Sequence, residues 1–450
     1  MKKMKCLKGK RVLFVLMALL AIPSAKAQDT LSINLNQALD IALSENPTIK
    51  VADKEIVLKK ESRKEAFAGL FPEVALVGSY TRNLKIQKVA IGGNVIAMGT
   101  DNTYGGGLTI ALPIYAPALY KSINLTATDV NLAVEKSRAS KLDLVNQVTK
   151  AYYQLLLAQD SYNVLLRSYS QSEDNYKVVK AKYEQGTVSE YDKISAEVQM
   201  RNLKPTVISA QNGKTLACLQ LKVLMGLEAN INLAVVGNLK DYEMQLFARM
   251  NDGSLSLNNN SDLLQLELNA KMLQQSLKLQ RTNFLPSLGL SFDYMYTSMN
   301  SDFKFSTYRW YPKSAIALNL SIPLFKASNF TKVKQTKIQM NQLMETRINA
   351  ERQLKMQATS YQNNMQASTE QVIGTKESVK QANKGREIAT KRYEVGAGTI
   401  LELNNSEVVL TQAELTYNQA IYDYLVSQAD LDKVLGRDRI VESPEENIQN

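Results

Sequence analysis

The residue types that most often carry out chemistry are nearly missing from this 450-residue chain. It has no histidine, which excludes His-based acid–base catalysis and the commonest metal ligand. Its two cysteines, Cys6 and Cys218, are too few for a structural zinc site or for a disulfide within the mature chain. The Gly105–Gly107 run opens an alternating strand and not a phosphate-binding helix. The sequence therefore predicts a protein that is not an enzyme and uses no metal or cofactor.

Two polar turns are the most informative local motifs, because they recur at equivalent places in a duplicated chain. Tyr183-Glu-Gln-Gly186-Thr-Val-Ser189 matches Tyr393-Glu-Val-Gly396-Ala-Gly-Thr399 at an offset of 210 residues. The same offset aligns residues 112–227 with 322–437 without a gap. A repeat of this size predicts two halves of a pseudo-symmetric wall.

Both repeats predict the same order of elements: helix, strand, loop, strand, long helix, turn and helix. The first repeat, 28–227, has a helix over 44–70, strands over 73–88 and 104–115, a long helix over 116–184 and a return helix over 189–227. The second repeat, 260–436, has a helix over 261–284, strands over 287–297 and 314–325, a long helix over 327–394 and a return helix over 400–436. An equatorial segment, 228–259, joins them, and 437–450 form a C-terminal tail.

The long helices carry an apolar seam with alternating spacings of four and three residues. Such a seam predicts coiled-coil packing, and a helix of this length, about 100 Å, predicts a rod or tunnel wall. The first seam is Leu144, Val148, Ala151, Leu155, Ala158, Tyr162, Leu165, Tyr169, Ser172, Tyr176, Val179 and Tyr183. The second is weaker and ends in Arg386, Ala389 and Tyr393.

The predicted strands alternate apolar and polar residues with a period of two, as in Leu108, Ile110, Leu112 and Ile114. Their length and pattern fit a tilted outer-membrane strand, and a soluble β-sandwich is the alternative. Tyrosines and Trp310 lie toward the loop ends, as in an interfacial belt. A proline marks each of the four opposite ends: Pro72, Pro113, Pro286 and Pro323. The prolines indicate that sheet passes directly into helix there.

Four strands are too few to close a membrane barrel, since single-chain barrels start at about eight. Open sheet edges are not tolerated in lipid, so several chains must contribute to one barrel. Eight strands from a dimer would fill their own interior, whereas twelve from a trimer would leave a lumen.

Residues 1–27 predict a secretory signal peptide, with a basic start, an apolar stretch too short to span a bilayer and a small-residue cleavage site at Ala25–Ala27. This segment holds seven basic residues. Without it the chain has 47 basic and 43 acidic residues, a net charge of +4 instead of +11. The basic balance is mostly a targeting signal, and no nucleic-acid partner is predicted.

The layout resembles the TolC-like outer membrane efflux protein family. The resemblance rests on Asn46-Pro47 at a helix start, the proline-marked junctions and the paired turns, and it covers nearly the whole mature chain. It implies a homotrimer with an all-α coiled-coil α-barrel in the periplasm and a 12-stranded transmembrane β-barrel, four strands per protomer, in outer membrane lipid. The implied partners are a periplasmic membrane-fusion adaptor and, indirectly, an inner-membrane pump.

The resemblance also assigns roles to residues at the turns. The implied adaptor-contact tips are Gly186, Thr187, Val188 and Ser189, and Gly396, Ala397, Gly398 and Thr399. Asp192 and Tyr393 match positions that link neighbouring coils in a closed periplasmic gate. Glu402 and Asn405 fall where some members have acidic rings, and Gly398 replaces an arginine that ties the gate in others. Packing and hydrogen bonds are therefore expected to close this gate more than ion pairs.

Blander interpretations remain open for these residues. The turn glycines can act only as helix C-caps, and Asp192 and Glu402 can act only as carboxylates that complement a helix dipole. At the level of function, the alternatives to an efflux duct are a channel for type I protein secretion and a periplasmic coiled-coil scaffold.

Overall fold

The computed structural model describes residues 31–248 and 255–437. They divide into two compact units. Unit 1 takes residues up to Ala42, Val148–Met244 and Val372–Tyr422, and unit 2 takes Leu43–Gln147, Gln245–Gln371 and the residues from Asp423. Each unit thus combines segments of both sequence repeats. The expected signal peptide, 1–27, and nearly all of the expected tail, 437–450, lie outside the described residues.

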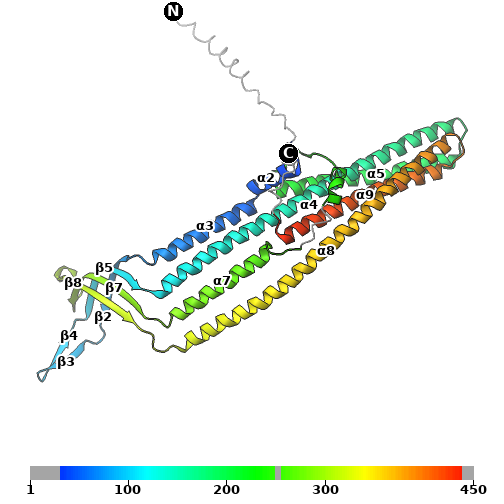
Figure 1. Ribbon diagram of the computed structural model, residues 1–450. Helices are drawn as coiled ribbons and strands as arrows, with labels where there is room; N and C mark the ends of the chain where they lie inside the picture. The colour runs from blue at the N-terminus through cyan, green and yellow to red at the C-terminus, as the bar shows by residue number, and fades with distance from the viewer. Residues whose placement is uncertain (1–30, 249–254, 438–450) are drawn as a thin grey trace, which may run out of the picture. The chain divides into compact units, whose positions relative to one another are not determined.

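Unit 2 contains an antiparallel sheet of four strands in the order β2-β5-β7-β8 (Figure 1). The strands are β2 (Glu73–Arg82), β5 (Asn102–Tyr115), β7 (Ser287–Asn300) and β8 (Tyr311–Ser321). The central pair, β5 and β7, joins the two repeats, with Leu108 opposite Tyr294. Within the described residues β2 and β8 are edge strands, each paired on one side only.

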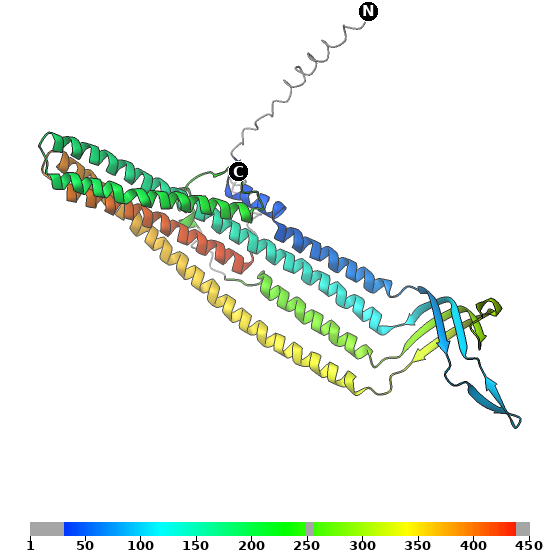
Figure 2. The same ribbon diagram turned by 180° about the vertical axis from the view of Figure 1, so that it is seen from behind.

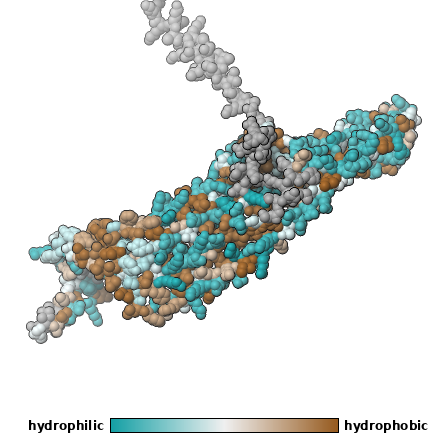
Figure 3. Space-filling view, in the orientation of Figure 1, coloured by the Kyte–Doolittle hydropathy of each residue, from teal (hydrophilic) through white to brown (hydrophobic). Residues whose placement is uncertain are grey.

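The strand register places apolar side chains on one face of this sheet. Leu76 lies opposite Leu108, and Phe292 lies opposite Ile316. The face is exposed within the chain, with Leu76 84% and Ile316 74% accessible. Small and polar residues occupy the other face, among them Thr109, Asp293 and Ala315. Figure 3 shows the apolar side chains gathered over the strand-bearing part of the unit.

All four predicted strands have different bounds in the structure. The strand predicted over 73–88 ends at Arg82, because Asn83 leaves the ladder and binds the carbonyls of Asp101 and Thr100. Beyond it, β3 (Gln87–Ile91) and β4 (Asn94–Met98) form a hairpin of their own (Figure 1). The two glycines between them, both at positive φ, were an overlooked hairpin signal.

The last strand, predicted over 314–325, runs from Tyr311 to Ser321. It starts earlier because Pro312 is tolerated on an edge strand, where its missing N–H costs no ladder bond. Pro323 follows two residues after its end. β5 and β7 are also longer than predicted, by two residues at the start and three at the end respectively.

Two helices of unit 2, α3 (Pro47–Ala68) and α7 (Ser261–Thr282), begin at asparagine caps. The helix predicted over 44–70 is α3, which starts later than predicted because the Asn46 side chain caps it by accepting from the Thr48 amide at 2.8 Å. A further helix that was not predicted, α2 (Leu35–Glu45), precedes it. Asn260 caps α7 in the same way. Its amide group also donates to the Val434 carbonyl at 2.7 Å, which ties the start of α7 to the end of α9 (Ile400–Leu435).

Polar contacts in unit 2 join the two repeats. On α4 (Pro117–Glu184), Glu135 accepts from the Ser261 hydroxyl at 2.6 Å and Arg138 donates to the Asn259 carbonyl at 2.8 Å. Lys433 of α9 pairs with Asp143 of α4 at 2.5 Å. An apolar cluster from α8 (Ala327–Glu394), α9 and the segment before α7 lies beside them: Leu257, Leu354, Ala358, Leu431, Val434 and Leu435.

In unit 1 the connecting segment, residues 231–244, binds helices of both repeats. It contains β6 (Leu233–Val235), which pairs in parallel with β1 (Leu31–Ile33), then η1 (Leu239–Tyr242) and the start of α6 (Glu243–Ala248). The Leu239 amide donates to Asp160 of α4 at 2.9 Å. Glu243 accepts from Lys376 of α8 at 2.6 Å and from Tyr417 of α9 at 2.8 Å.

These contacts stabilise the charged form of Glu243 more than that of Asp160. Burial raises the pKa of Asp160, with one amide bond opposing it. Burial also favours the neutral form of Glu243, but the hydrogen bonds from Lys376 and Tyr417 outweigh it and lower the pKa of Glu243. The return helix of the first repeat, α5 (Glu190–Leu224), completes the unit beside α4 (Figure 2). No helix among the described residues is long and apolar enough to cross a membrane.

A prediction follows from Gly436, which ends α9 at φ 65°. A Cβ there would overlap the Asn259 carbonyl oxygen, so Gly436→Ala should lower the free energy of unfolding by about 2 kcal/mol or more. Gly396→Ala is the matched control: φ is 76° but nothing lies within 4 Å, so about 1 kcal/mol is expected. Urea unfolding of both variants measures the difference. Equal losses would contradict the close approach at Gly436.

Candidate gate at the helical turns

The two predicted tips are helix-ending turns of the same construction, and both lie in unit 1. In the first, the Gly186 amide donates to Tyr183 O and the Thr187 amide donates to Lys182 O. In the second, the amides of Gly396 and Ala397 make the equivalent bonds to Tyr393 and Arg392. Gly186 and Gly396 have backbone φ angles of 73° and 76°, which residues other than glycine rarely adopt. The C-cap interpretation of these glycines therefore holds, and their adaptor role stays a prediction.

The second helix of each hairpin starts at a hydroxyl cap. Ser189 and Asp192 form a capping box: the Ser189 hydroxyl accepts from the Asp192 amide, and the Asp192 carboxylate accepts from the Ser189 amide, each at 3.2 Å. Thr399 caps α9 by accepting from the Glu402 amide at 3.2 Å. Asp192 thus stabilises the start of α5, as the interpretation as a helix-terminal carboxylate predicts. Its role in a gate remains a prediction.

An apolar cluster holds the two hairpins together within unit 1, and their turns lie side by side in both views (Figures 1 and 2). Its buried members are Val179, Ala196, Ile400 and Leu403, with Val188 and Tyr393 packed against them. Lys182 of α4 lies over the Tyr393 ring, 4.8 Å from its centroid. The structure therefore brings Tyr393 together with residues of both hairpins.

The tyrosine hydroxyl itself has no hydrogen-bond partner among the described residues, although it is buried. Burial, and secondarily the charge of Asp192, raise the pKa of Tyr393. The charge of Asp192 thus acts on Tyr393, but no hydrogen bond joins these two predicted gate residues.

The remaining predicted gate residues lie at the start of α9. Glu402 and Asn405 are both exposed, one turn apart on the same face. Arg392 of α8 approaches Glu402 at 3.4 Å and donates to the Ala397 carbonyl at 3.0 Å. A Cβ on Gly398 would lie 3.0 Å from the Cβ of Arg392, so a larger residue there would displace Arg392. Arg392 thus places a positive charge beside Glu402. The sequence analysis did not predict Arg392 as a site residue.

A second missed pair lies further along the same hairpin. Glu407 of α9 and Arg386 of α8 approach at 3.7 Å, and the Glu407 side chain is 11% exposed. The Arg386 Nε and the Glu407 Oε1 are buried without a hydrogen-bond partner among the described residues. Burial raises the pKa of Glu407, although the Arg386 charge opposes the shift. Arg386 occupies an otherwise apolar seam position, which was the sequence signal for this pair.

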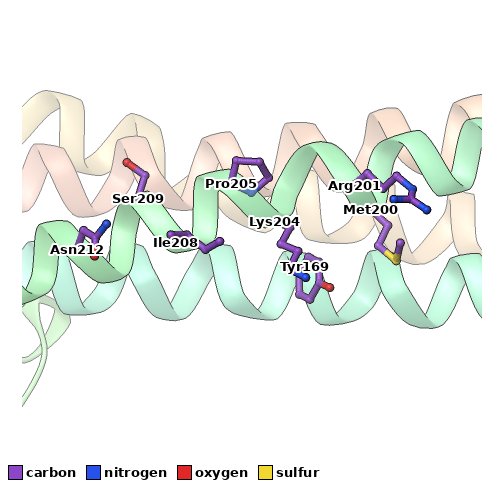
Figure 4. Close-up of a pocket in the computed structure, with 8 residues that line it drawn as sticks. All are labelled: Tyr169, Met200, Arg201, Lys204, Pro205, Ile208, Ser209 and Asn212. Carbon is purple, nitrogen blue, oxygen red and sulfur yellow. The ribbon is translucent and has the colours of Figure 1, made fainter.

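A shallow groove lies between α4 and α5, away from the predicted tips (Figure 4). Its volume is about 620 Å³, and it is lined by Tyr169, Met200, Arg201, Lys204, Pro205, Ile208, Ser209 and Asn212. Pro205 inside α5 has no amide hydrogen to donate to the preceding turn. Within the described residues no group of three or more His, Cys, Asp or Glu side chains could hold a metal ion.

The comparison with known families decides the class of this chain. Residues 38–227 and 253–437, one segment from each repeat, match the sequence model of the family described as outer membrane efflux protein. The chain belongs to the outer membrane efflux protein family. The resemblance that the paired turns and proline junctions predicted is therefore confirmed, as is the outer membrane as the location of the protein.

The sequence of this chain matches individual family members over most of their length. The chain is 23% identical to the outer membrane protein TolC of Vibrio cholerae serotype O1 over 438 residues, which cover 94% of each chain. It is 22% identical to the alkaline protease secretion protein AprF of Pseudomonas aeruginosa, covering 90% of this chain and 84% of AprF.

The fold is that of a solved outer membrane channel. The crystal structure of the Campylobacter jejuni CmeC outer membrane channel superposes with a TM-score of 0.69 at 19% identity, covering 89% of this chain and 85% of CmeC. The predicted fold class, helices of two tandem repeats with a strand region, is thus confirmed at the level of the chain.

The buried Glu407 generates a pH prediction. Because burial raises its pKa in the folded chain, protonation stabilises the hairpin pair, and this stabilisation is lost as the pH rises through the folded pKa. Glu407→Gln should therefore raise the free energy of unfolding at neutral pH by about 1 kcal/mol and flatten its pH dependence above pH 4.5. Glu402→Gln, an exposed carboxylate on the same helix, is the control.

The measurement is urea unfolding at several pH values above the ordinary glutamate pKa. Wild type should gain stability as the pH falls through this window, while Glu407→Gln should not. A variant that keeps the full pH dependence would show that another group is responsible.

Proposed function

We propose that this protein is the outer membrane exit duct of a tripartite efflux system, and that it passes small molecules from a periplasmic adaptor and an inner-membrane pump to the outside. Membership of the outer membrane efflux protein family supports the class. The observation that carries the proposal is the open sheet of unit 2, which has one exposed apolar face and continues into long helices.

The working form is proposed to be a homotrimer. Strands β2 and β8 leave backbone groups unpaired along both edges of the sheet within the described residues. Each unpaired group costs several kcal/mol in lipid, so the edges have to pair with other chains. Neighbouring strands of the sheet run in opposite directions, so β2 and β8 are antiparallel to each other. The β8 strand of one copy can therefore pair antiparallel with β2 of the next. Three copies then give twelve strands, enough for a lumen lined by the small and polar face.

No bond is made or broken in this proposal. The chain has no histidine, and Cys218, its one described cysteine, is half-buried and free. Transport then needs a pathway and a gate, with energy supplied by the proposed inner-membrane pump.

The gate is proposed at the two tips. Their apolar cluster holds the hairpins together, whereas the Tyr393 hydroxyl, Arg386 and Glu407 each bury a polar atom without a hydrogen-bond partner among the described residues. Such an atom costs about 1–3 kcal/mol, and separation of the hairpins would return it to water. The packed arrangement is thus held by apolar contacts and opposed by these polar groups. This balance is suitable for a gate that an adaptor opens.

A second candidate is the outer membrane channel of a type I protein secretion system. It is favoured by the likeness to AprF, a protein named for alkaline protease secretion, over 90% of this chain. Both functions use the same duct and differ in the partner at the tips. Loss of drug resistance on deletion supports efflux, whereas loss of an extracellular protein supports secretion.

The first prediction tests the duct itself. The mature protein, extracted in detergent and added to planar bilayers, should insert and give small, stable conductance steps, because the hairpins are packed together at the tips. Chemical cross-linking should give a mass of three chains. A water-soluble oligomer that does not insert would reject the duct and favour the periplasmic scaffold.

The second prediction tests the tips. Ala397 is exposed in the turn between α8 and α9, and its backbone bonds do not depend on its side chain. Ala397→Trp should lower efflux-dependent resistance about tenfold or more by blocking close approach of an adaptor, while the trimer and its conductance persist.

Ala367→Trp, the same change at an exposed position of α8 in unit 2, is the control and should keep resistance. Wild-type resistance in Ala397→Trp would show that the adaptor does not bind this turn.

A further inference from the structure

The loop between β7 and β8, residues 301–310, folds back over the strand ends of unit 2. Tyr104 of β5 meets two aromatic rings of this loop, Phe305 at 5.7 Å and Tyr308 at 5.2 Å between ring centroids. Tyr80 of β2 stacks on the other side of Tyr104 at 4.8 Å. An aromatic cluster therefore joins the loop to two strands of the first repeat.

The register identifies the face of the sheet that the loop covers. Tyr80 lies opposite Tyr104, and four residues further along the same strands Leu76 lies opposite Leu108. Side chains an even number of residues apart point to the same face of a strand. The loop thus packs on the apolar face, at its outer end, and leaves the small and polar face uncovered.

Hydrogen bonds hold the loop in this position. The Tyr308 hydroxyl donates to the Asp302 carbonyl at 2.5 Å, and the Asn102 amide group donates to the same carbonyl at 3.4 Å. Asn102 is 1% exposed and accepts from the Tyr80 hydroxyl at 2.9 Å. A loop fixed in advance loses little entropy when it binds a partner.

Three basic residues lie on the loop or on the strand beside it. Arg82 of β2 lies on the apolar face, 5.5 Å above the Phe303 ring, and Lys304 and Arg309 are exposed on the loop. In the described part of the chain none of the three forms an ion pair with a carboxylate. The nearby acid of the loop, Asp302, already accepts from the Lys304 amide at 3.2 Å. Trp310, next to Arg309, is 50% exposed.

We propose that Arg82, Lys304, Arg309 and Trp310, the loop surface, bind phosphorylated lipid headgroups at the outer surface of the membrane. This inference rests on the proposed function, because it needs the apolar sheet face to lie against lipid. Guanidinium and ammonium groups are good phosphate ligands, and an indole ring is favoured at headgroup depth. The loop surface places both beside the end of the apolar face, where the hydrocarbon meets the headgroups.

The test uses Trp310 as its reporter, because it is the single tryptophan of the chain. The full-length mature protein is reconstituted in phosphatidylcholine vesicles, and its tryptophan fluorescence is quenched with brominated phosphatidylcholine, brominated bisphosphorylated lipid A or brominated dephosphorylated lipid A. Quenching by bisphosphorylated lipid A should indicate a several-fold enrichment around Trp310 over the other two lipids. Conductance of the same preparation is recorded in parallel.

Variants assign this enrichment to the three cations. Changing Arg82, Lys304 or Arg309 to Gln should each lower the enrichment of bisphosphorylated lipid A about fivefold or until it is lost. Lys313→Gln is the matched control: Lys313 lies opposite Met295 on the other face of the sheet, so the enrichment should stay unchanged.

Two results would overturn the inference while leaving the proposed duct intact, provided that conductance persists. Equal quenching by all three lipids would show that phosphate is not recognised, and no quenching by any lipid would show that the loop does not face the membrane. If the protein neither inserts nor conducts, the proposed function and this inference both fail.

Discussion

The pairing of backbone hydrogen bonds in the four-stranded sheet is the constraint on which the rest of this architecture depends. β5 and β7 have neighbours on both sides, whereas β2 and β8 each have one within the described chain. An edge of this kind is tolerated in water but not in hydrocarbon. The proposed association of copies through β2 and β8 rests on this backbone chemistry, because it would pair both edges of a sheet whose apolar face lies against lipid.

Polar contacts distinguish fixed regions of the chain from the tips. Around the connecting segment and at the start of α7, several polar groups are paired: Asp160 accepts from an amide, Glu243 accepts from Lys376 and Tyr417, and Asn260 donates to Val434. Near the tips, Tyr393 and Glu407 bury oxygen atoms that accept or donate no hydrogen bond in the described chain. A satisfied network resists rearrangement, while an unsatisfied group makes the packed state costly. The proposed gate therefore lies where apolar contacts hold the two hairpins together and buried polar atoms oppose the packed state.

Sequence reasoning was most accurate where structure is local. Both long helices end at the predicted residues, since the seam stops at the glycine turns. It was less accurate at the outer loops: the β3–β4 hairpin and the early start of β8 at Tyr311 were not predicted. Pro312 is tolerated within β8 because its edge position costs no ladder bond. Arg392 and Glu407 were missed as site residues because their importance comes from the neighbouring helix, not from their own pattern.

The sequence by itself determined the tandem repeat, the apolar face of each strand, the coiled-coil seam and the two glycine turns. All of these follow from short-range periodicity or from the backbone demands of one or two residues. Only the tertiary structure decided which segments share a compact unit, that Arg386 meets Glu407, and that the β7–β8 loop covers Tyr104 on the apolar face. Periodicity shows which face of an element needs a partner, but the partner is chosen by packing between residues far apart in the chain.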